Sequence, residues 1–261
     1  MITLTQFIES HHRFRIYECM NNLEIAKRAA LETGKFLKKN FYQSQKLTLD
    51  HGKDIKLKID EKAEELIFEI IKQHSMLPIL SEESGISSAL GEKYWVIDPL
   101  DGSSNYFRKI DICAISIALI ENDKPVLGVI SDFMNDDLYY ASKGEGAFCN
   151  EGTIEVSNVK DIEKGTIMTG IPAKEDYSDD EFALMIKHFH KWKKVRMIGS
   201  AAIANLYVAT GRADCYEEKD TFIWDIAAGS IIVEEAGGVA IISDVRNDYR
   251  VDAKFTNGKL N

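Results

Sequence analysis

The apolar residues of the first third of the chain recur with helical spacing. Between about Asn21 and Gln45 they fall at Ile25, Ala29 and Phe36, a period of three to four that predicts a helix with one buried face. A second apolar stripe over Ala63–Ile71 predicts another helix from Asp60 to His74, with Asp60 capping its start. The chain therefore opens with two amphipathic helices.

Beyond Pro78 the apolar residues gather into short runs bounded by Gly, Asp and Asn, a pattern typical of β-strands. The runs Ile112–Ile120 and Val126–Phe133 are separated by a few polar residues. They predict an antiparallel hairpin whose loop is slightly longer than the minimum.

The second half of the chain mixes both patterns, with Gly211 and Gly237 as helix stops. We expect strands near Thr166–Thr169, Val195–Ile198 and Asp214–Tyr216, and helices near Asp180–Lys191, Ser200–Thr210 and Trp224–Glu235. Together with the first half this predicts a layered α/β chain (α+β or α/β) that forms one unit over residues 1–261. The loop from about Asn150 to Asp161 divides it into two tightly packed halves, about 20–155 and 156–261.

Composition places the chain among ordinary globular proteins. It has 261 residues, 45% hydrophobic and 28% charged, enough to bury a large core. The 42 acidic and 32 basic residues give a net charge of −10, which opposes nonspecific binding to nucleic acid or an anionic membrane. We expect neither as a required partner. A phosphorylated substrate is itself negative, so its binding site in this acidic chain needs local positive charge. Bound divalent cations supply that charge.

The cysteines and histidines offer no competing site. His188 and His190 are two positions apart in a predicted helix and so lie on different faces; we expect them at the surface. No basic leader and no apolar run of about 18 residues is present, so we expect a cytoplasmic protein without a membrane span. The scattered cysteines are expected to be reduced, mostly buried thiols: Cys19, Cys113, Cys149 and Cys215.

Carboxylates at the ends of apolar runs carry the strongest chemical signal. Asp98 ends one run and Asp101 follows three residues later, with Pro99 and Gly102 between and after them. These residues predict a turn, and the two aspartates either cap that turn or converge on a ligand. If a helix starts after Gly102, its first backbone N–H groups, including those of Ser103 and Ser104, point to the same place.

Two further acidic side chains favour the ligand hypothesis. Glu82 follows an apolar strand and Asp225 starts an apolar helix. Burying such carboxylates is costly unless a positive charge lies beside them. Oxygen ligands suit Mg²⁺ or Mn²⁺ better than zinc. The sequence thus indicates a magnesium site.

Four segments carry a family resemblance: SEESG at 81–85, WVIDPLDGSSNY at 95–106, IGSAAIANLYVATGRADCY at 198–216 and WDIAAGSIIVEEAGG at 224–238. In order and spacing the chain resembles the inositol monophosphatases of the lithium-sensitive, metal-dependent phosphatase superfamily. The resemblance covers about Leu23 to Leu260. It implies an αβαβα sandwich, a cytoplasmic homodimer and inhibition by lithium.

The resemblance also implies a ligand set for two or three Mg²⁺ ions. Glu82, Asp98 and the carbonyl of Leu100 would bind the first ion, and Asp98, Asp101 and Asp225 the second. Asp54 is a possible ligand in a mobile loop for a third. Glu82 and the Ser103 hydroxyl would prepare the attacking water, while the ions acidify that water and neutralise the leaving group.

The substrate contacts are carried over in the same way. The phosphate would lie against the N–H groups of Gly102 and Ser103, and the substrate hydroxyls near the start of the helix after Ile198 and near Glu218, although Glu217 is adjacent. The full implied set is Leu100, Asp101, Gly102, Ser103, Gly199, Ser200, Ala201, Glu218 and Asp225.

Departures from the family pattern concern specificity. Ser103 and Ser104 replace the usual Thr, and Phe107–Asp111 lacks the His, Gly and Pro common in relatives.

We expect a Mg²⁺-dependent phosphatase of small phosphate monoesters, with inositol monophosphate as the first candidate substrate. Alternatives within the superfamily are fructose-1,6-bisphosphatase, 3'-phosphonucleotide phosphatase and NADP phosphatase. A regulatory or binding protein on the same fold is the non-enzymatic alternative.

Overall fold

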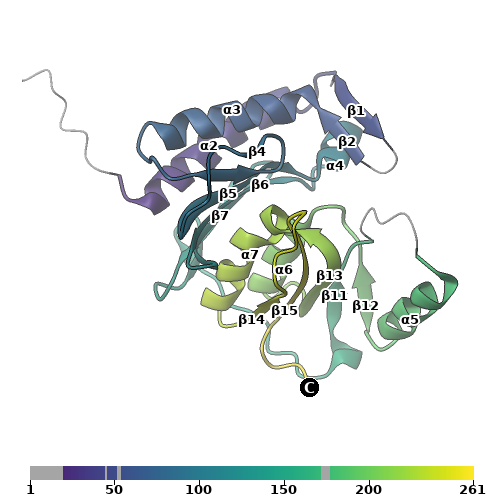
Figure 1. The fold of residues 1–261 in the computed structure, drawn as a ribbon. Coiled ribbons are helices and arrows are strands. Elements are labelled where there is room, and N and C mark those ends of the chain that lie inside the picture. Colours follow the sequence, from purple (N-terminus) through teal and green to yellow (C-terminus); the bar gives the residue numbers. More distant parts are fainter. Residues whose placement is uncertain (1–19, 45, 52–53, 172–176) are drawn as a thin grey trace, which may run out of the picture.

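The chain folds into alternating layers of helices and sheets (Figure 1). The computed structural model describes residues 20–44, 46–51, 54–171 and 177–261, with the backbone alone for 47–51 and 54–56. Along the stack the layers are a helix pair, an eight-stranded sheet, a second helix pair, a five-stranded sheet and one outer helix. This is the αβαβα order that the resemblance implied.

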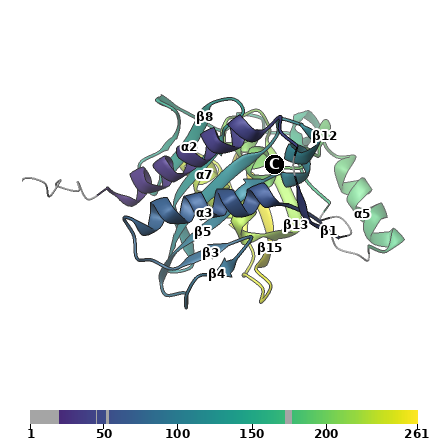
Figure 2. The ribbon, with the colours of Figure 1, turned by 90° about the horizontal axis from the view of Figure 1, so that it is seen from above.

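The first two layers are formed by the first half of the chain. Helices α2 (Asn22–Asn40) and α3 (Lys58–Lys72) lie side by side over one face of the large sheet (Figure 2). Between them the chain forms the hairpin of β1 (Leu47–His51) and β2 (Asp54–Leu57). The apolar stripes of both helices pack on Trp95, Ile97 and Ile117 of the sheet, so burial of one face holds this layer in place.

The large sheet has the order β10-β9-β8-β7-β6-β5-β3-β4 and is antiparallel except where β3 runs parallel to β5. Its strands are β3 (Ile79–Ser81), β4 (Gly85–Ile86), β5 (Lys93–Asp101), β6 (Ala114–Glu121), β7 (Lys124–Asp132), β8 (Asp137–Ser142), β9 (Ala147–Cys149) and β10 (Gly152–Thr153).

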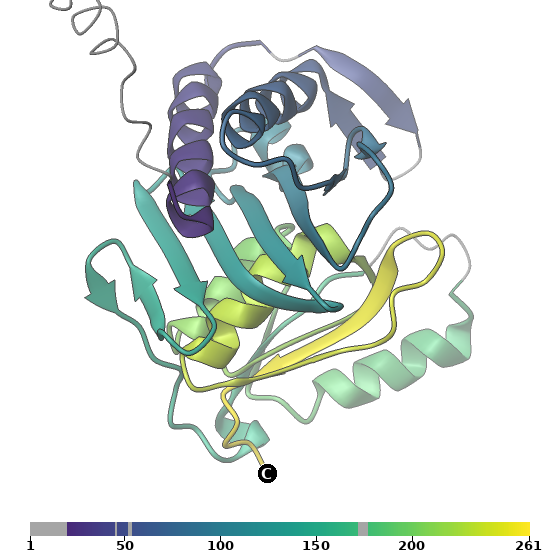
Figure 3. The ribbon, with the colours of Figure 1, turned by 60° about the vertical axis from the view of Figure 1, so that its left-hand side comes forward.

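Helices α6 (Ala201–Ala209) and α7 (Ile223–Glu235) fill the space between the two sheets (Figure 3). Both are apolar on nearly every side, as expected for a helix covered all round. Gly128 of β7 lies against α7, where an added Cβ would come within 2.5 Å of the Ala228 carbonyl oxygen. The short helix α4 (Ser103–Arg108) follows β5 and lies beside β2.

The small sheet has the order β12-β11-β13-β15-β14, with β11 parallel to β12 and β13 and the other pairs antiparallel. Outside it lies α5 (Asp179–Phe189), which starts with a capping box between Ser178 and Glu181. The strands are β11 (Thr166–Met168), β12 (Lys194–Arg196), β13 (Cys215–Phe222), β14 (Val239–Ile242) and β15 (Arg250–Thr256), and the 3₁₀ turn η1 (Ile162–Lys164) precedes them.

Most predicted elements are confirmed to within a few residues, but two predictions were wrong in detail. The loop between β6 and β7 is minimal: only Asn122 and Asp123 turn the chain, with φ of 51° and 60°, which suits a right-twisted two-residue hairpin. The second concerns β5, below. His188 and His190 lie at the surface, and the ring of His188 is 3.6 Å from Glu217. Within the described residues, no helix has the length and apolar character needed to span a bilayer.

Candidate active site and metal centre

A bulge in β5 brings Asp98 and Asp101 to one face of the large sheet. Asp98 pairs with Ser116 of β6 and Asp101 with Ala114, so β5 advances three residues while β6 advances two. Residues three apart in a regular strand face opposite ways, and the extra residue restores the same direction. The predicted turn at Pro99 is therefore a continuation of the strand, and both carboxylates face α6 and α7.

Asp225 completes the cluster from the first turn of α7. One carboxylate oxygen from each of Asp98, Asp101 and Asp225 lies within 4.8 Å of the others. Two residues that precede α7 hold the Asp225 side chain in place. Its Oδ2 accepts hydrogen bonds from the Thr221 hydroxyl at 3.0 Å and from the Phe222 N–H at 3.1 Å. Three of the predicted metal ligands thus meet at one point.

The three carboxylates share an environment that disfavours their charge. Burial, followed by the neighbouring carboxylates of Glu82, Asp101 and Asp225, raises the pKa of Asp98 well above its usual value. Burial raises the pKa of Asp101 to about 6, and burial with the charge of Asp101 raises the pKa of Asp225 to about 8. Among the described residues, no Lys or Arg forms an ion pair with any of the three.

These residues fit a hard divalent cation. Buried acidic groups without a basic partner are stabilised as anions by a metal ion, and an all-oxygen donor set suits Mg²⁺ or Mn²⁺. The cluster of Asp98, Asp101 and Asp225 can therefore bind a metal.

The remaining predicted ligands of the first ion lie around Asp98. Glu82 follows β3 and shares a side-chain hydrogen bond with Asp98, and its N–H donates to the Ile97 carbonyl at 3.2 Å. The Ser103 hydroxyl donates to the Leu100 carbonyl at 3.0 Å. Glu82 is thus next to the aspartate cluster, and the two predicted oxygen groups of Leu100 and Ser103 contact each other.

Asp101 also caps the start of α6. Its carboxylate accepts hydrogen bonds from the Ser200 hydroxyl, from the Ala201 N–H at 3.2 Å and from the Ala202 N–H at 2.9 Å. The polar groups of Ser200 and Ala201, predicted to contact substrate, are directed to Asp101 in this structure. Gly199 precedes them with a φ of 73°. This cap fixes the second half of the chain to the aspartate cluster.

The structure separates Glu218 from its neighbour Glu217. The Tyr216 hydroxyl donates to Glu218 at 3.0 Å, and burial raises the pKa of Glu218 to about 7, with a further contribution from the charge of Asp101. Glu217 lies on the opposite face of β13, where it pairs with Lys254 at 3.1 Å. Of the two glutamates, Glu218 is the one beside the aspartates.

Two residues that the sequence interpretation assigned no role, Asn105 and Thr221, help to build the site. The side-chain amide of Asn105 in α4 donates to the carbonyl oxygens of Ile112 at 2.8 Å and Ile198 at 2.7 Å. Thr221 donates to Asp225 as described above. Asn105 lies within the DGSSN motif, and its position directly after the predicted ligands was the available signal; Thr221 gave none.

Two other predicted regions lie at the border of the site. Asp54 belongs to β2, and its side chain is outside the described residues. The segment Phe107–Asp111, which departs from the family pattern, contains the end of α4. There Lys109 adopts a φ of 63°, and its ammonium contacts the carbonyl oxygens of Phe41 and Gln43. This segment is attached to the end of α2.

Comparison with known proteins gives one consistent result. The model of the inositol monophosphatase family matches residues 20–254. The chain is 37% identical to the Nus factor SuhB of Pasteurella multocida over 222 residues, covering 83% of each protein. It is 34% identical to the fructose-1,6-bisphosphatase/inositol-1-monophosphatase of Aquifex aeolicus, covering 83% of this chain and 84% of that protein.

A solved structure agrees with these matches. The inositol monophosphatase of Anabaena superposes with a TM-score of 0.78 at 34% identity, covering 91% of this chain and 90% of the other. The fold, the aspartate cluster and the sequence matches point to the same conclusion: the chain belongs to the inositol monophosphatase family.

Proposed function

We propose that the chain is a Mg²⁺-dependent phosphatase that hydrolyses small phosphate monoesters, with inositol monophosphate as the first substrate to test. The observation that carries the proposal is the meeting of Asp98, Asp101 and Asp225 oxygens within 4.8 Å in a buried setting. Together with Glu82 and the Leu100 carbonyl they would hold two Mg²⁺ ions. When bound, Mg²⁺ supplies positive charge opposite the phosphate and lowers the pKa of a water.

The other groups of the site have roles that follow from their position. Glu82 lies beside Asp98 and would accept the proton of the attacking water. The Ser103 hydroxyl donates to Leu100, which leaves its oxygen lone pairs to orient that water. The N–H groups of Gly102 and Ser103, at the start of α4, would donate to the phosphate oxygens.

Glu218 supports a substrate that carries hydroxyl groups. It is a partly buried carboxyl group beside the aspartates, and a carboxylate accepts hydrogen bonds from the vicinal hydroxyls of a cyclitol or sugar. Gly170 packs closely on it, since an added Cβ there would lie 2.5 Å from Glu218 Oε1. These contacts favour inositol and sugar phosphates over flat aromatic esters.

Phosphate release from a substrate panel tests this function. The panel contains myo-inositol 1-phosphate, fructose 1,6-bisphosphate, adenosine 3',5'-bisphosphate and NADP⁺, each assayed with Mg²⁺, with EDTA and with added Li⁺. We expect Mg²⁺-dependent, Li⁺-inhibited release that is fastest with inositol monophosphate. Failure of the full chain to release phosphate from every compound, in the presence of Mg²⁺, would contradict the proposal.

The name of one relative favours a second candidate function. The Pasteurella protein is a Nus factor, so this chain is a candidate for the same role, separate from phosphate hydrolysis. The test is whether this chain replaces that relative in its Nus-factor role, with wild type and Asp98→Asn compared. Replacement by both proteins would support a role that needs no catalysis, and replacement by neither would exclude it.

A further inference from the structure

A second bulge, in β13, controls which way the residues beside Asp225 face. Glu218 pairs with Ala253 of β15 and Thr221 pairs with Val251, so β13 advances three residues while β15 advances two. Ala253 and Val251 both face the core and are 2% and 0% exposed. The extra residue therefore puts Glu218 and Thr221 on the same inner face. Without it, one of them would face outward.

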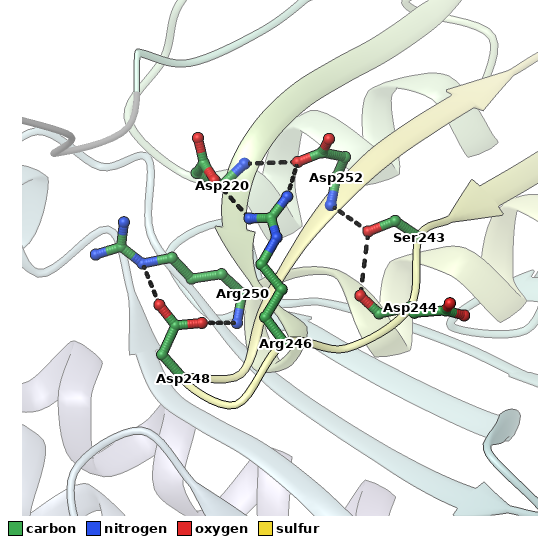
Figure 4. A network of polar contacts seen from close by, with 7 residues as sticks. All are labelled: Asp220, Ser243, Asp244, Arg246, Asp248, Arg250 and Asp252. Carbon is green, nitrogen blue, oxygen red and sulfur yellow. Dashed lines mark hydrogen bonds and ion pairs between the residues drawn. The ribbon is translucent and has the colours of Figure 1, made fainter. Parts of the chain in front are cut away.

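The bulge contains a strained residue, Asp220, whose φ is 57°. A non-glycine residue in this left-handed region is costly and persists only where its surroundings hold it. Here the Asp220 N–H donates to Asp252 Oδ1 at 3.1 Å. The guanidinium of Arg246 bridges the two carboxylates, with Nη1 at 2.5 Å from Asp220 Oδ1 and Nη2 at 2.5 Å from Asp252 Oδ1 (Figure 4).

Arg246 belongs to the turn between β14 and β15, and this turn is itself well anchored. The Arg246 N–H donates to the Arg250 carbonyl at 3.0 Å, and the Asp252 N–H donates to the Ser243 hydroxyl at 2.8 Å. In Figure 4 the guanidinium of Arg246 lies between the carboxylates of Asp220 and Asp252. A fixed turn can hold the guanidinium in one place, as a bidentate bridge requires.

The same turn reaches the start of α7. The Tyr249 carbonyl accepts a hydrogen bond from the Ile223 N–H at 3.0 Å, and the Tyr249 ring lies 5.9 Å from that of Trp224. Ile223 and Trp224 directly precede Asp225 in α7. The turn thus contacts both the bulge that carries Thr221 and the helix turn that carries Asp225.

We propose that Arg246 is a positioning residue: by bridging Asp220 and Asp252 it holds the β13 bulge in the form that directs Thr221 to Asp225 and Glu218 toward the substrate. The expected effect of Arg246 on catalysis rests on the proposed function. The dependence of the β13 bulge on Arg246 does not, and it can be tested without a phosphatase assay. Arg246 is paired with Asp220 and Asp252 and acts on the aspartate cluster through Thr221.

Exposed ion pairs contribute little to global stability. A positioning role of Arg246 therefore predicts a local effect near the site, whereas a merely structural role predicts a lower stability of the whole fold. Arg246 and Asp252 are 39% and 44% exposed in their side chains. Loss of the bridge is therefore expected to leave the unfolding midpoint nearly unchanged while loosening residues 218–225. Local loosening of this kind is visible in amide hydrogen exchange.

The first experiment compares hydrogen exchange of the metal-free full chain in wild type, Arg246→Ala and the control Arg28→Ala. Arg28 forms an equally exposed pair with Glu32 at 2.8 Å on α2. We expect exchange in 218–225 to accelerate about tenfold in Arg246→Ala alone. Unchanged exchange there would overturn the proposal, whether or not the chain is a phosphatase.

The second experiment follows the effect to the metal site. We expect Arg246→Ala to raise the half-saturating Mg²⁺ concentration about threefold to tenfold, by calorimetry and in the phosphatase assay, with partial recovery in Arg246→Lys. In a cycle with Thr221→Val the two effects should be less than additive, because Arg246 acts through Thr221. Full additivity of the two effects would refute the proposal that Arg246 acts through Thr221. Lack of phosphatase activity in wild type would refute the proposed function alone.

Discussion

The side-chain amide of Asn105 donates a hydrogen bond of 2.7 Å to the carbonyl of Ile198, across 93 positions of sequence. The same amide reaches the Ile112 carbonyl at 2.8 Å. Asn105 thereby joins the helix that follows Asp101 to the segment that leads into α6. Together with the hydrogen bonds from Ser200, Ala201 and Ala202 to Asp101, this amide therefore holds the two elements together beside the aspartate cluster.

Replacing Asn105 should weaken both stability and activity. Asn105→Ala leaves two partly buried carbonyl groups without their donor, which costs about 1–3 kcal/mol of unfolding free energy, and it frees α4 to move relative to α6. We expect a lower denaturant midpoint and a reduced kcat. The matched control is Asn135→Ala, since the amide of Asn135 donates at 2.9 Å to Asp132 within a local turn. An equal loss of kcat in both variants would contradict the bridging role.

Asp98 is the residue whose substitution should be most damaging to turnover. Asp98→Asn removes one charge of the aspartate cluster while keeping the size and the Leu100 N–H contact of 2.9 Å. We expect phosphatase activity to fall by roughly two orders of magnitude or more with the fold intact. Asp132→Asn is the control, because Asp132 is also a buried aspartate in the same sheet. Near-normal turnover of Asp98→Asn would refute its assignment as a metal ligand.

The sequence predicted which carboxylates matter but not how they come together. Acidic residues at the ends of apolar runs are costly to bury, and this cost drew attention to Glu82, Asp98 and Asp225, which the family resemblance then implied as metal ligands. The direction of Asp101, however, depends on the register of β5 against β6. Register arises from pairing between strands, which a single sequence does not display.

The same limit explains why Thr221 was missed and why Glu218, although predicted, could not be separated from Glu217. Thr221 and Glu218 face the site only because β13 has a bulge, and that bulge depends on Asp252 and Arg246, far along the chain. Strands β14 and β15 were not predicted: β14 is a run of only four apolar residues, and in β15 the apolar residues alternate with polar or charged ones. The amphipathic helices α2 and α3, in contrast, were located by local periodicity alone.

Substitution of Gly102 should be destabilising for two reasons, backbone strain and a steric contact, and a control variant separates them. The φ of Gly102 is 85°, and an added Cβ would lie 2.8 Å from the Ile112 carbonyl oxygen. We expect Gly102→Ala to lower the unfolding free energy by ~1–2 kcal/mol through left-handed strain and by a further amount through the contact, and to remove most of the activity. Gly144→Ala has the strain without the contact, because at a φ of 81° nothing lies within 4 Å. Equal denaturation midpoints of the two variants would contradict the steric contribution.

The aspartate cluster also predicts how stability depends on pH and on metal. In the metal-free protein, burial and the charge of Asp101 raise the pKa of Asp225 to about 8, and burial raises that of Asp101 to about 6, whereas an unfolded aspartate titrates near 3.9. Between these values the folded chain binds more protons than the unfolded chain. The contribution of these groups is therefore fully present below about pH 4 and is lost as the pH rises toward 8.

Denaturant unfolding at pH 5, 6, 7 and 8 measures this effect. In EDTA we expect stability to fall with rising pH by up to ~1.4 kcal/mol per pH unit for each titrating carboxyl group. Mg²⁺ binds the deprotonated carboxylates, so the stabilisation that it adds should grow over the same interval. Asp225→Asn removes one of these groups and should make the EDTA profile flatter. Profiles that stay parallel with and without Mg²⁺ would show that the metal does not bind at Asp98, Asp101 and Asp225.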